Sequence, residues 1–402
     1  MGRKNKRSSF GPGFLVTAAF IGPGTVTSCS LAGAKFGYSL IYALIFATIT
    51  TLVLQEMTGR LALASGCDLA QALREFPQKT LSRWIFILLT LSSITLGCAA
   101  YEAGNIIGGS LGLEMVSAVP QKYWVALISL AAIFILSRRK YKLVEKFLIF
   151  LVFLMSLSFL AAFIILKPDF RLILKGMVPS VPSNSLYIIL ALVGTTVVPY
   201  NLFLHSSAVK IKWSSAGRLR EVRKDLLVSI CLGGMISTFI VATSAVTFYE
   251  KGFPLEKGAH LAQQLSPLFG PFTNFFFGLG FFAAGMSSAL TAPYAAAFAS
   301  SGILGWKGGH DAPGFKGVWL AVILTGFVVS LFNFSPLAVI VFAQVANGLI
   351  LPVASVFLLV ILNNRRKMGK LANNWKQNVM GIMIILVVSF LGLWNIIKIF
   401  VR

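Results

Sequence analysis

Long apolar stretches recur from one end of this sequence to the other, and they constrain the fold more than any other feature. A stretch of roughly 18 or more apolar residues is long enough to cross a lipid bilayer as a helix. We read eleven such spans, at about 12–34, 37–64, 81–110, 123–137, 145–166, 186–210, 225–249, 272–303, 316–332, 335–362 and 378–401. The gaps between them reach about twenty residues, too short for a soluble domain. The sequence therefore predicts one all-α polytopic membrane domain over residues 1–402.

The charged residues are distributed unevenly along the chain, which carries a formal net charge of +23. Apolar residues make up 57% of the sequence and charged residues 12%, too little polar surface for a soluble protein of this size. With the N-terminus placed inside, 26 of the 35 Lys and Arg residues fall in inner loops. This positive-inside bias predicts a multi-pass cell-membrane protein with a cytoplasmic N-terminus and an outer C-terminus. This bias accounts for the high net positive charge by the orientation of the chain in the lipid bilayer, so no nucleic-acid partner is expected. We expect the protein to be a monomer.

Two of the predicted spans contain a Gly/Pro interruption near the middle, at residues 20–25 and 194–200. Proline removes a helical hydrogen bond and glycine frees the backbone to unwind, which a membrane tolerates only where the backbone is buried or lines a wet cavity. The breaks open two successive runs of five helices. We therefore expect repeats at about 12–166 and 186–362, with an additional helix at about 378–401. Matched breaks of this kind indicate a substrate site near the middle of the bilayer.

Several segments of the sequence share a pattern with one known family. These segments are Gly33–Tyr38, Asp68–Gln71, Pro199–Ser206, Gly285–Ser288 and Gln344, together with a Leu-Gln pair in the second span. In these residues the sequence resembles the NRAMP divalent-metal transporters. This resemblance extends over most of the chain at the expected spacing. The resemblance implies the LeuT-type fold, in which two inverted five-helix repeats surround the substrate site. Here one additional helix would follow, giving eleven transmembrane helices.

The sequence departs from that family at the central site. Metal-transporting members read Asp-Pro-Gly-Asn in the first span and Met-Pro-His in the sixth. Here the four ligand positions hold Gly22, Thr25, Val198 and Tyr200. Hydroxyls and carbonyls replace the hydration shell of a transition metal less well than carboxylate, imidazole or sulfur. The departures predict that no transition metal is bound or transported, as in a branch of NRAMP-related proteins that resembles bicarbonate transporters.

The altered site is expected to prefer an anion. Two half-helices would direct positive N-terminal ends at it, each equivalent to about half a unit charge, and no aspartate offsets them. We therefore predict a secondary active transporter of a small monoanion by alternating access, with bicarbonate as the expected substrate and nitrate or formate equally compatible. The predicted substrate-binding residues are Gly22, Pro23, Gly24, Thr25, Thr195, Thr196, Val198 and Tyr200.

Transport is expected to be a symport driven by sodium or by protons, and the sequence leaves that choice open. The resemblance places Glu102 and His205 where the family has groups associated with proton passage, and an intramembrane carboxylate is a functional candidate in its own right. Ser287 and Ser288 resemble the oxygen-only surroundings of a sodium site in other LeuT-type transporters. Gln344 completes the set of coupling candidates.

Two other functions stay open: an amino-acid or other small-solute transporter, and a divergent divalent-cation transporter. An enzyme is not expected, because the chain has three His residues, no paired carboxylates at helical spacing and no phosphate loop. Its four cysteines, which form no CxxC pair, predict neither a disulfide nor a thiolate metal site. We expect no organic cofactor, and a coupling Na⁺ is the one bound ion that the sequence suggests.

Overall fold

The structure is a computed structural model that describes residues 11–13, 21–75, 80–117, 119–138, 142–213, 215–307, 309–332 and 334–400. Its longer helices are α2 (Pro23–Phe36), α3 (Ile41–Ser65), α5 (Thr80–Ser117), α6 (Gln121–Ser137), α7 (Lys142–Leu166), α9 (Leu186–Thr196), α10 (Pro199–Lys212), α11 (Leu219–Ser244), α13 (Thr273–Leu304), α14 (Pro313–Ser330), α15 (Pro336–Leu362) and α17 (Trp375–Phe400). Its shorter segments include α4 (Leu69–Glu75), α8 (Phe170–Gly176), η3 (Gly258–Leu265), α12 (Ser266–Phe269), α16 (Arg365–Met368) and η6 (Gly369–Leu371). The predicted all-α class is confirmed.

The helices are long and apolar enough for a multi-pass membrane protein. Within the described residues, nine helical segments meet the length and hydropathy needed to cross a bilayer. The fourth predicted span corresponds to α6, which has 17 residues. Residues 14–20 of the first predicted span lie outside the described residues. The count of eleven and the side on which each terminus lies therefore stay predictions.

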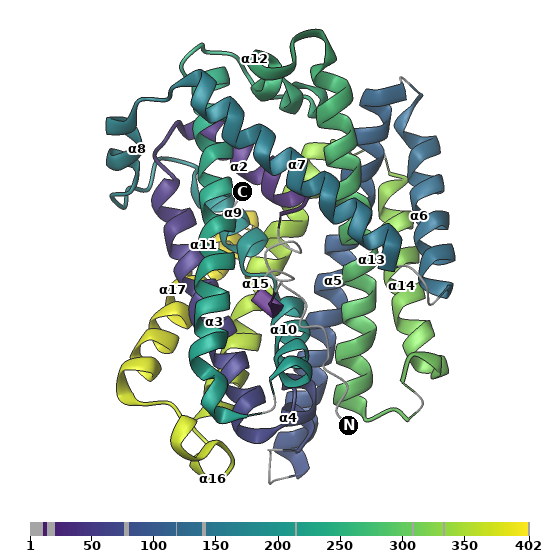
Figure 1. Cartoon of the computed structure of the whole chain (residues 1–402), viewed down its shortest axis with the longest axis vertical. Helices are drawn as coiled ribbons and strands as arrows, with labels where there is room; N and C mark the ends of the chain where they lie inside the picture. The colour runs from purple at the N-terminus through teal and green to yellow at the C-terminus, as the bar shows by residue number, and fades with distance from the viewer. Residues whose placement is uncertain are drawn as a thin grey trace, which may run out of the picture.

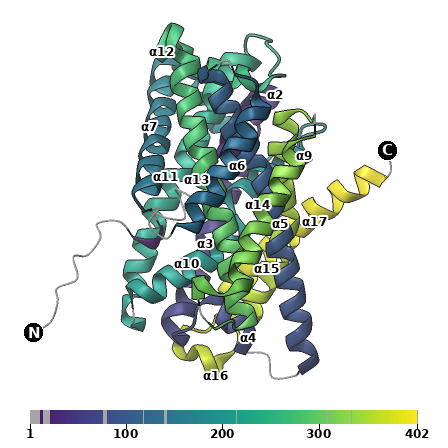
Figure 2. The same ribbon diagram turned by 90° about the vertical axis from the view of Figure 1, so that its right-hand side faces the viewer.

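The two discontinuous helices lie in the interior of the bundle. Figure 1 shows α3, α11 and α17 on one side and α5, α13, α14 and α6 on the other, with α9, α10 and α15 between them. In the chain segment that runs from α9 through the break to α10, 89% of the 18 residues tested as a membrane span are buried inside the protein. The corresponding share for α14 is 28%. The view turned by 90° also places α10 and α15 in the interior and α17 at the periphery (Figure 2). Of the candidate spans, the segment that contains the second break is thus the most deeply buried.

Both breaks begin new helices at a proline. Gly22 is extended, with φ −124° and ψ −173°, and α2 starts at Pro23. Val198 is likewise extended, and α10 starts at Pro199. Proline suits a first helical position because its missing N–H would have no partner there. At both positions the Gly/Pro pattern starts a new helix, and at the second break it also separates α10 from the end of α9.

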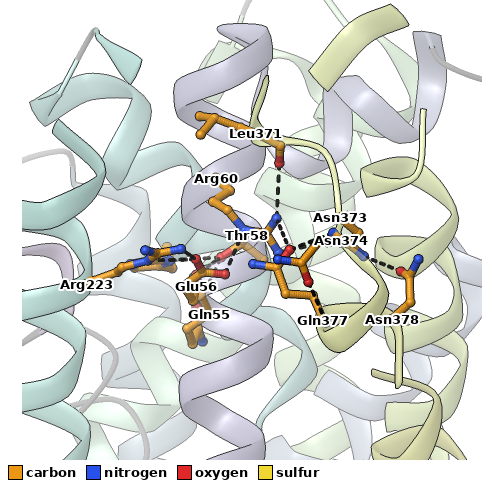
Figure 3. Close-up of polar contacts among 11 residues, drawn as sticks. Gln55, Glu56, Thr58, Arg60, Arg223, Leu371, Asn373, Asn374, Gln377 and Asn378 are labelled. Carbon is orange, nitrogen blue, oxygen red and sulfur yellow. Dashed lines mark hydrogen bonds and ion pairs between the residues drawn. The ribbon is translucent and has the colours of Figure 1, made fainter. Parts of the chain in front are cut away.

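A buried arginine fixes one end of the bundle, the end that carries α4 and α16. Arg60 on α3 is 2% exposed, and its Nε donates to Glu56 Oε2 over 2.8 Å. The other oxygen of Glu56 accepts from Arg223 on α11, with an Nη2–Oε1 distance of 2.7 Å. Figure 3 shows Arg223 and the chain after α16 on opposite sides of α3. One carboxylate thus holds two guanidinium groups at the junction of α3 and α11.

The same arginine also holds the turn between α15 and α17. Its terminal nitrogens donate to the Leu371 carbonyl over 3.1 Å, to Gln377 Oε1 over 3.2 Å and to Asn373 Oδ1 over 2.8 Å (Figure 3). A buried guanidinium is tolerated when its donors are satisfied in this way. Arg60 therefore ties α3 to the turn through three acceptors.

We expect Arg60→Met to destabilise the protein by about 3 kcal/mol, because it leaves Glu56 and the turn without their buried partner. Arg223→Met removes the other guanidinium on the same carboxylate. Arg223 is 52% exposed, so this control should cost about 1 kcal/mol or less. Unfolding of the purified protein by SDS titration in mixed micelles measures both. Equal losses would show that Arg60 acts as an ordinary surface ion pair.

Candidate functional site

The two helix breaks meet through a pair of hydroxyl groups. Thr25 Oγ1 on α2 lies 2.9 Å from Thr195 Oγ1 on α9, and both side chains are fully buried. The two residues are 170 positions apart in the sequence. Thr25 is in the first turn of α2, and Thr195 is in the last turn of α9. The contact brings together the two segments predicted to form the substrate site.

An amide and a hydroxyl from the second half of the chain line the break in α2. The side-chain amide of Gln344 on α15 lies against Gly24, where any Cβ would overlap it. Gln344 Nε2 donates to the carbonyl one turn earlier, while its buried Oε1 has no hydrogen-bond partner among the described residues. A Cβ at Gly22 would lie 3.0 Å from Ser288 Oγ on α13. Predicted residues from four helices therefore surround one small region.

Two tyrosines add buried hydroxyl groups beside the break. Tyr101 on α5 and Tyr200 on α10 pack edge to face, with ring centroids 5.9 Å apart. Both hydroxyls are buried without a hydrogen-bond partner among the described residues. A Cβ at Gly22 would lie 3.7 Å from the Tyr101 hydroxyl. Tyr101 was not among the predicted site residues, although a tyrosine next to Glu102 in an apolar span is a signal that could have identified it.

The remaining predicted substrate residues lie near the second break. Thr196 Oγ1 donates to the Leu192 carbonyl within α9, so this hydroxyl is used by its own helix. The Thr196 carbonyl accepts from Thr51 Oγ1 on α3 over 3.3 Å. Val198 is buried and offers its extended backbone. Thr51 is the second contributor that sequence reasoning missed, because nothing in an apolar helix marks which hydroxyl reaches a neighbouring break.

The coupling candidates lie in separate polar contacts. Glu102 Oε2 accepts from Asn105 Nδ2 over 3.2 Å, and its Oε1 is buried without a partner among the described residues. His205 Nδ1 lies 2.9 Å from Thr58 Oγ1 on α3. The described residues show no direct hydrogen bond between Glu102 and His205. Ser287, next to the buried Ser288, is only half-buried.

The oxygen atoms gathered at the breaks define what the site can bind. The described residues contain no group of three or more His, Cys, Asp or Glu side chains that could hold a metal. Hydroxyl, amide and carbonyl oxygens remain, and these are the ligands of hard cations such as Mg²⁺, Ca²⁺ and Mn²⁺. Only Val197 and Val198 separate the carbonyl end of α9 from the amide end of α10. Opposite helix dipoles therefore face the same break.

Comparison with known proteins identifies the class as a family of membrane transporters. Residues 13–398 match the family described as natural resistance-associated macrophage protein-like (Nramp), so the chain belongs to the Nramp family. It is 30% identical over 404 residues to a protein of Nostoc sp. named divalent metal cation transporter MntH, covering 96% of this chain and 90% of that protein. A protein of the same name from Caldanaerobacter subterraneus is 26% identical, covering 96% of this chain and 91% of that protein.

Solved structures agree on the fold. The Eremococcus coleocola manganese transporter superposes with a TM-score of 0.80 at 21% identity, covering 96% of this chain and 85% of that chain. Mhp1, a nucleobase-cation-symport-1 family transporter, gives a TM-score of 0.60 at 14% identity, covering 96% and 91%. At these identities the similarity concerns the fold, and it supports the predicted LeuT-type architecture.

These relatives overturn the predicted substrate. They are named as transporters of divalent metal cations, so the predictions of bicarbonate or another small inorganic anion, and of a site closed to transition metals, are wrong. The anion argument counted the positive ends of α2 and α10 and left out the carbonyl end of α9. It also did not consider that each hydroxyl can accept and so bind a cation. Membership of a bicarbonate-transporting branch is not confirmed.

We expect Thr195→Val to weaken the junction between the two breaks, because it removes a buried hydrogen bond and leaves the Thr25 hydroxyl with fewer partners. The expected cost is about 1 kcal/mol in the free energy of unfolding. Thr50→Val on α3 is the matched control, since Thr50 is equally buried and its hydroxyl has no partner among the described residues. SDS titration measures both variants. If Thr50→Val lowers the free energy of unfolding as much as Thr195→Val does, the loss comes from removal of a buried hydroxyl in general and not from the Thr25–Thr195 contact.

Proposed function

We propose that this chain is a secondary active transporter of a divalent metal cation that works by alternating access. The names of its relatives support the substrate class, and the fold of its structural neighbours supports the mechanism. The observation that carries the proposal is the convergence of Thr25, Thr195 and the unpaired Gln344 Oε1 at the meeting of two helix breaks. These are oxygen acceptors at the place where the fold binds substrate.

The uncharged ligand set favours a cation that retains part of its hydration shell. The part of the chain that the structure describes places no carboxylate among these ligands, so protein oxygens replace only some of the water molecules around the ion. The Tyr101 and Tyr200 hydroxyls are buried and have no hydrogen-bond partner among the described residues, which suits them to hold such water molecules. Hard cations accept mixed oxygen and water ligands more readily than soft ones. Mn²⁺ is the first ion to test, because a structural neighbour is named a manganese transporter.

The test is uptake of Mn²⁺, Mg²⁺ and Ca²⁺ by proteoliposomes, compared with protein-free vesicles. Protein-dependent uptake of at least one of these ions, reduced by the others in competition, is expected. Bicarbonate and a mixture of amino acids form the negative arms. Uptake of an amino acid without any divalent flux would contradict the proposal and support the small-solute alternative.

We expect Gly22→Asp to lower the KM for Mn²⁺ by about tenfold or more, because it adds a negative charge beside the ion. Gly22 is the extended residue that caps α2, a position that favours aspartate. Its added Cβ would lie 3.0 Å from Ser288 Oγ, so that side chain must shift slightly in both variants. Gly22→Asn is the matched control, with nearly the same shape and no charge. Stronger Mn²⁺ uptake in the Asp variant alone supports a cation at this break. Loss of uptake in the Asp variant, with the Asn variant active, would contradict it.

We further propose that protons drive the transport and that Glu102 carries them. Its carboxyl is buried, has one amide as its hydrogen-bond partner in the described part of the chain, and packs where Gly326 leaves room on α14. A carboxyl in such surroundings can take up and release a proton as the helices move. The sodium alternative rests on Ser287 and Ser288, of which only Ser288 is fully buried beside the break.

Glu102→Gln should abolish the stimulation of Mn²⁺ uptake by an inward proton gradient and leave uptake down an Mn²⁺ gradient measurable. Glu114→Gln on the same helix is the control, since its carboxylate accepts from the backbone amide of Gln121 at the start of α6. Uptake is measured with the internal and external pH set independently, in sodium and in choline. Stimulation that follows sodium, and that Glu102→Gln leaves unchanged, would transfer the coupling role to the serines.

A further inference from the structure

The turn between α15 and α17 carries four exposed cations and no acidic residue. Arg365, Arg366, Lys367 and Lys370 all lie on the surface of α16 and η6. The sequence has no Asp or Glu between Leu362 and Phe400. Among the described residues, Arg365, Arg366 and Lys370 form no ion pair. The turn therefore presents concentrated positive charge that the protein itself does not neutralise.

Buried contacts fix the backbone conformation of this turn. Met368 is 2% exposed and anchors α16 in the core. Arg60 fixes the Leu371 carbonyl and the Asn373 side chain, and Asn373 donates in turn to Asn378 over 2.9 Å (Figure 3). The backbone of the cationic residues is thus fixed before a ligand binds, which reduces the entropy lost on binding.

The carboxylate of Glu56, on a helix that contacts the turn, does not neutralise the exposed cations of the turn. α3, which carries Glu56, contacts both α16 and η6. Glu56 already holds Arg60 and Arg223, one on each oxygen. Arg223 is itself 52% exposed, so the surface on the other side of α3 is also basic. Positive charge is therefore in excess on both sides of this helix end.

The position of the cations along the chain places them at the membrane surface. The candidate span of α17 begins at Trp375, which is 71% exposed, a residue type that favours the interface between headgroups and acyl chains. One turn further on, Val379, Met380 and Met383 are exposed apolar residues on the same helix. The cations precede this apolar surface by only a few residues, so in a bilayer spanned by α17 they would lie near the lipid headgroups.

We propose that the turn formed by α16 and η6 binds the phosphate headgroup of an anionic phospholipid through Arg365, Arg366 and Lys370. Trp375 and the first exposed residues of α17 contact the acyl chains of the same lipid. Basic residues next to a transmembrane helix recognise anionic lipids by this combination of charge and apolar contact. The site is separate from the substrate site, and it does not depend on which ion the protein carries.

The test is lipid retention by the full-length protein in detergent, measured by native mass spectrometry with phosphatidylglycerol or phosphatidylcholine added. Wild-type protein should retain phosphatidylglycerol in preference to phosphatidylcholine. The triple variant Arg365→Gln, Arg366→Gln, Lys370→Gln should retain it roughly five-fold less for each charge removed, or about a hundred-fold less in all. The control variant Lys146→Gln, Lys307→Gln, Lys316→Gln removes three exposed lysines elsewhere and should retain phosphatidylglycerol as wild type does.

Two results would overturn the proposal. Equal loss of phosphatidylglycerol in the control variant would show that total charge, and not this turn, attracts the lipid. Displacement of the lipid by excess inorganic phosphate would show a site for the free ion. An unchanged unfolding midpoint establishes that the triple variant is folded. If it is not folded, Arg366→Gln alone provides the comparison, with an expected loss of about five-fold.

Discussion

Broken helices inside a bilayer impose the constraint on which the rest of this structure depends. An unwound backbone has no water to bond with, so it must be enclosed by other helices or used by a ligand. The break after α9 is enclosed by α3 and α15, and the Thr51 hydroxyl satisfies the Thr196 carbonyl. At the break before α2, glycine lets the Gln344 side chain approach the backbone. Burial of the breaks therefore decides which helices are central and which face lipid.

The same constraint determines the chemistry of the site. Because a break pairs the carbonyl end of one half-helix with the amide end of the next, its potential is not simply positive. Hydroxyls and amides placed between these ends act as acceptors toward a cation and as donors toward water. The chemistry of the site is consequently compatible with membership of a family in which relatives are named divalent metal cation transporters. Aspartate, methionine and histidine are nevertheless absent from its ligand positions. Under the proposed function, the ion would be bound with more of its water and less of the protein's charge.

Much of the fold, and part of the site, could be predicted from the sequence. Apolar runs and Gly/Pro interruptions are local signals, and they gave the helices and both breaks. The resemblance to the family, and not these patterns, led to Ser288 and Gln344, which the structure places beside the first break. Tyr101 and Thr51 could not be found in this way, because their roles depend on which face of α5 or α3 meets the breaks. The predicted substrate class was wrong for a different reason. The charge of the site was estimated from the two positive helix ends alone, without the neighbouring carbonyl, hydroxyl and amide oxygens.

Helix α3 connects the substrate site with the basic end of the molecule. Along one helix, Thr51 bonds the second break, Thr58 meets His205 on α10, and Arg60 holds the turn before α17. A rigid helix transmits displacement along its length, so a shift of α10 against α3 at the site would strain the contacts of Arg60. The buried guanidinium has several acceptors in fixed geometry, which makes one arrangement of the turn strongly preferred. Lipid bound at that turn would favour the same arrangement, and so the position of α3 that goes with it.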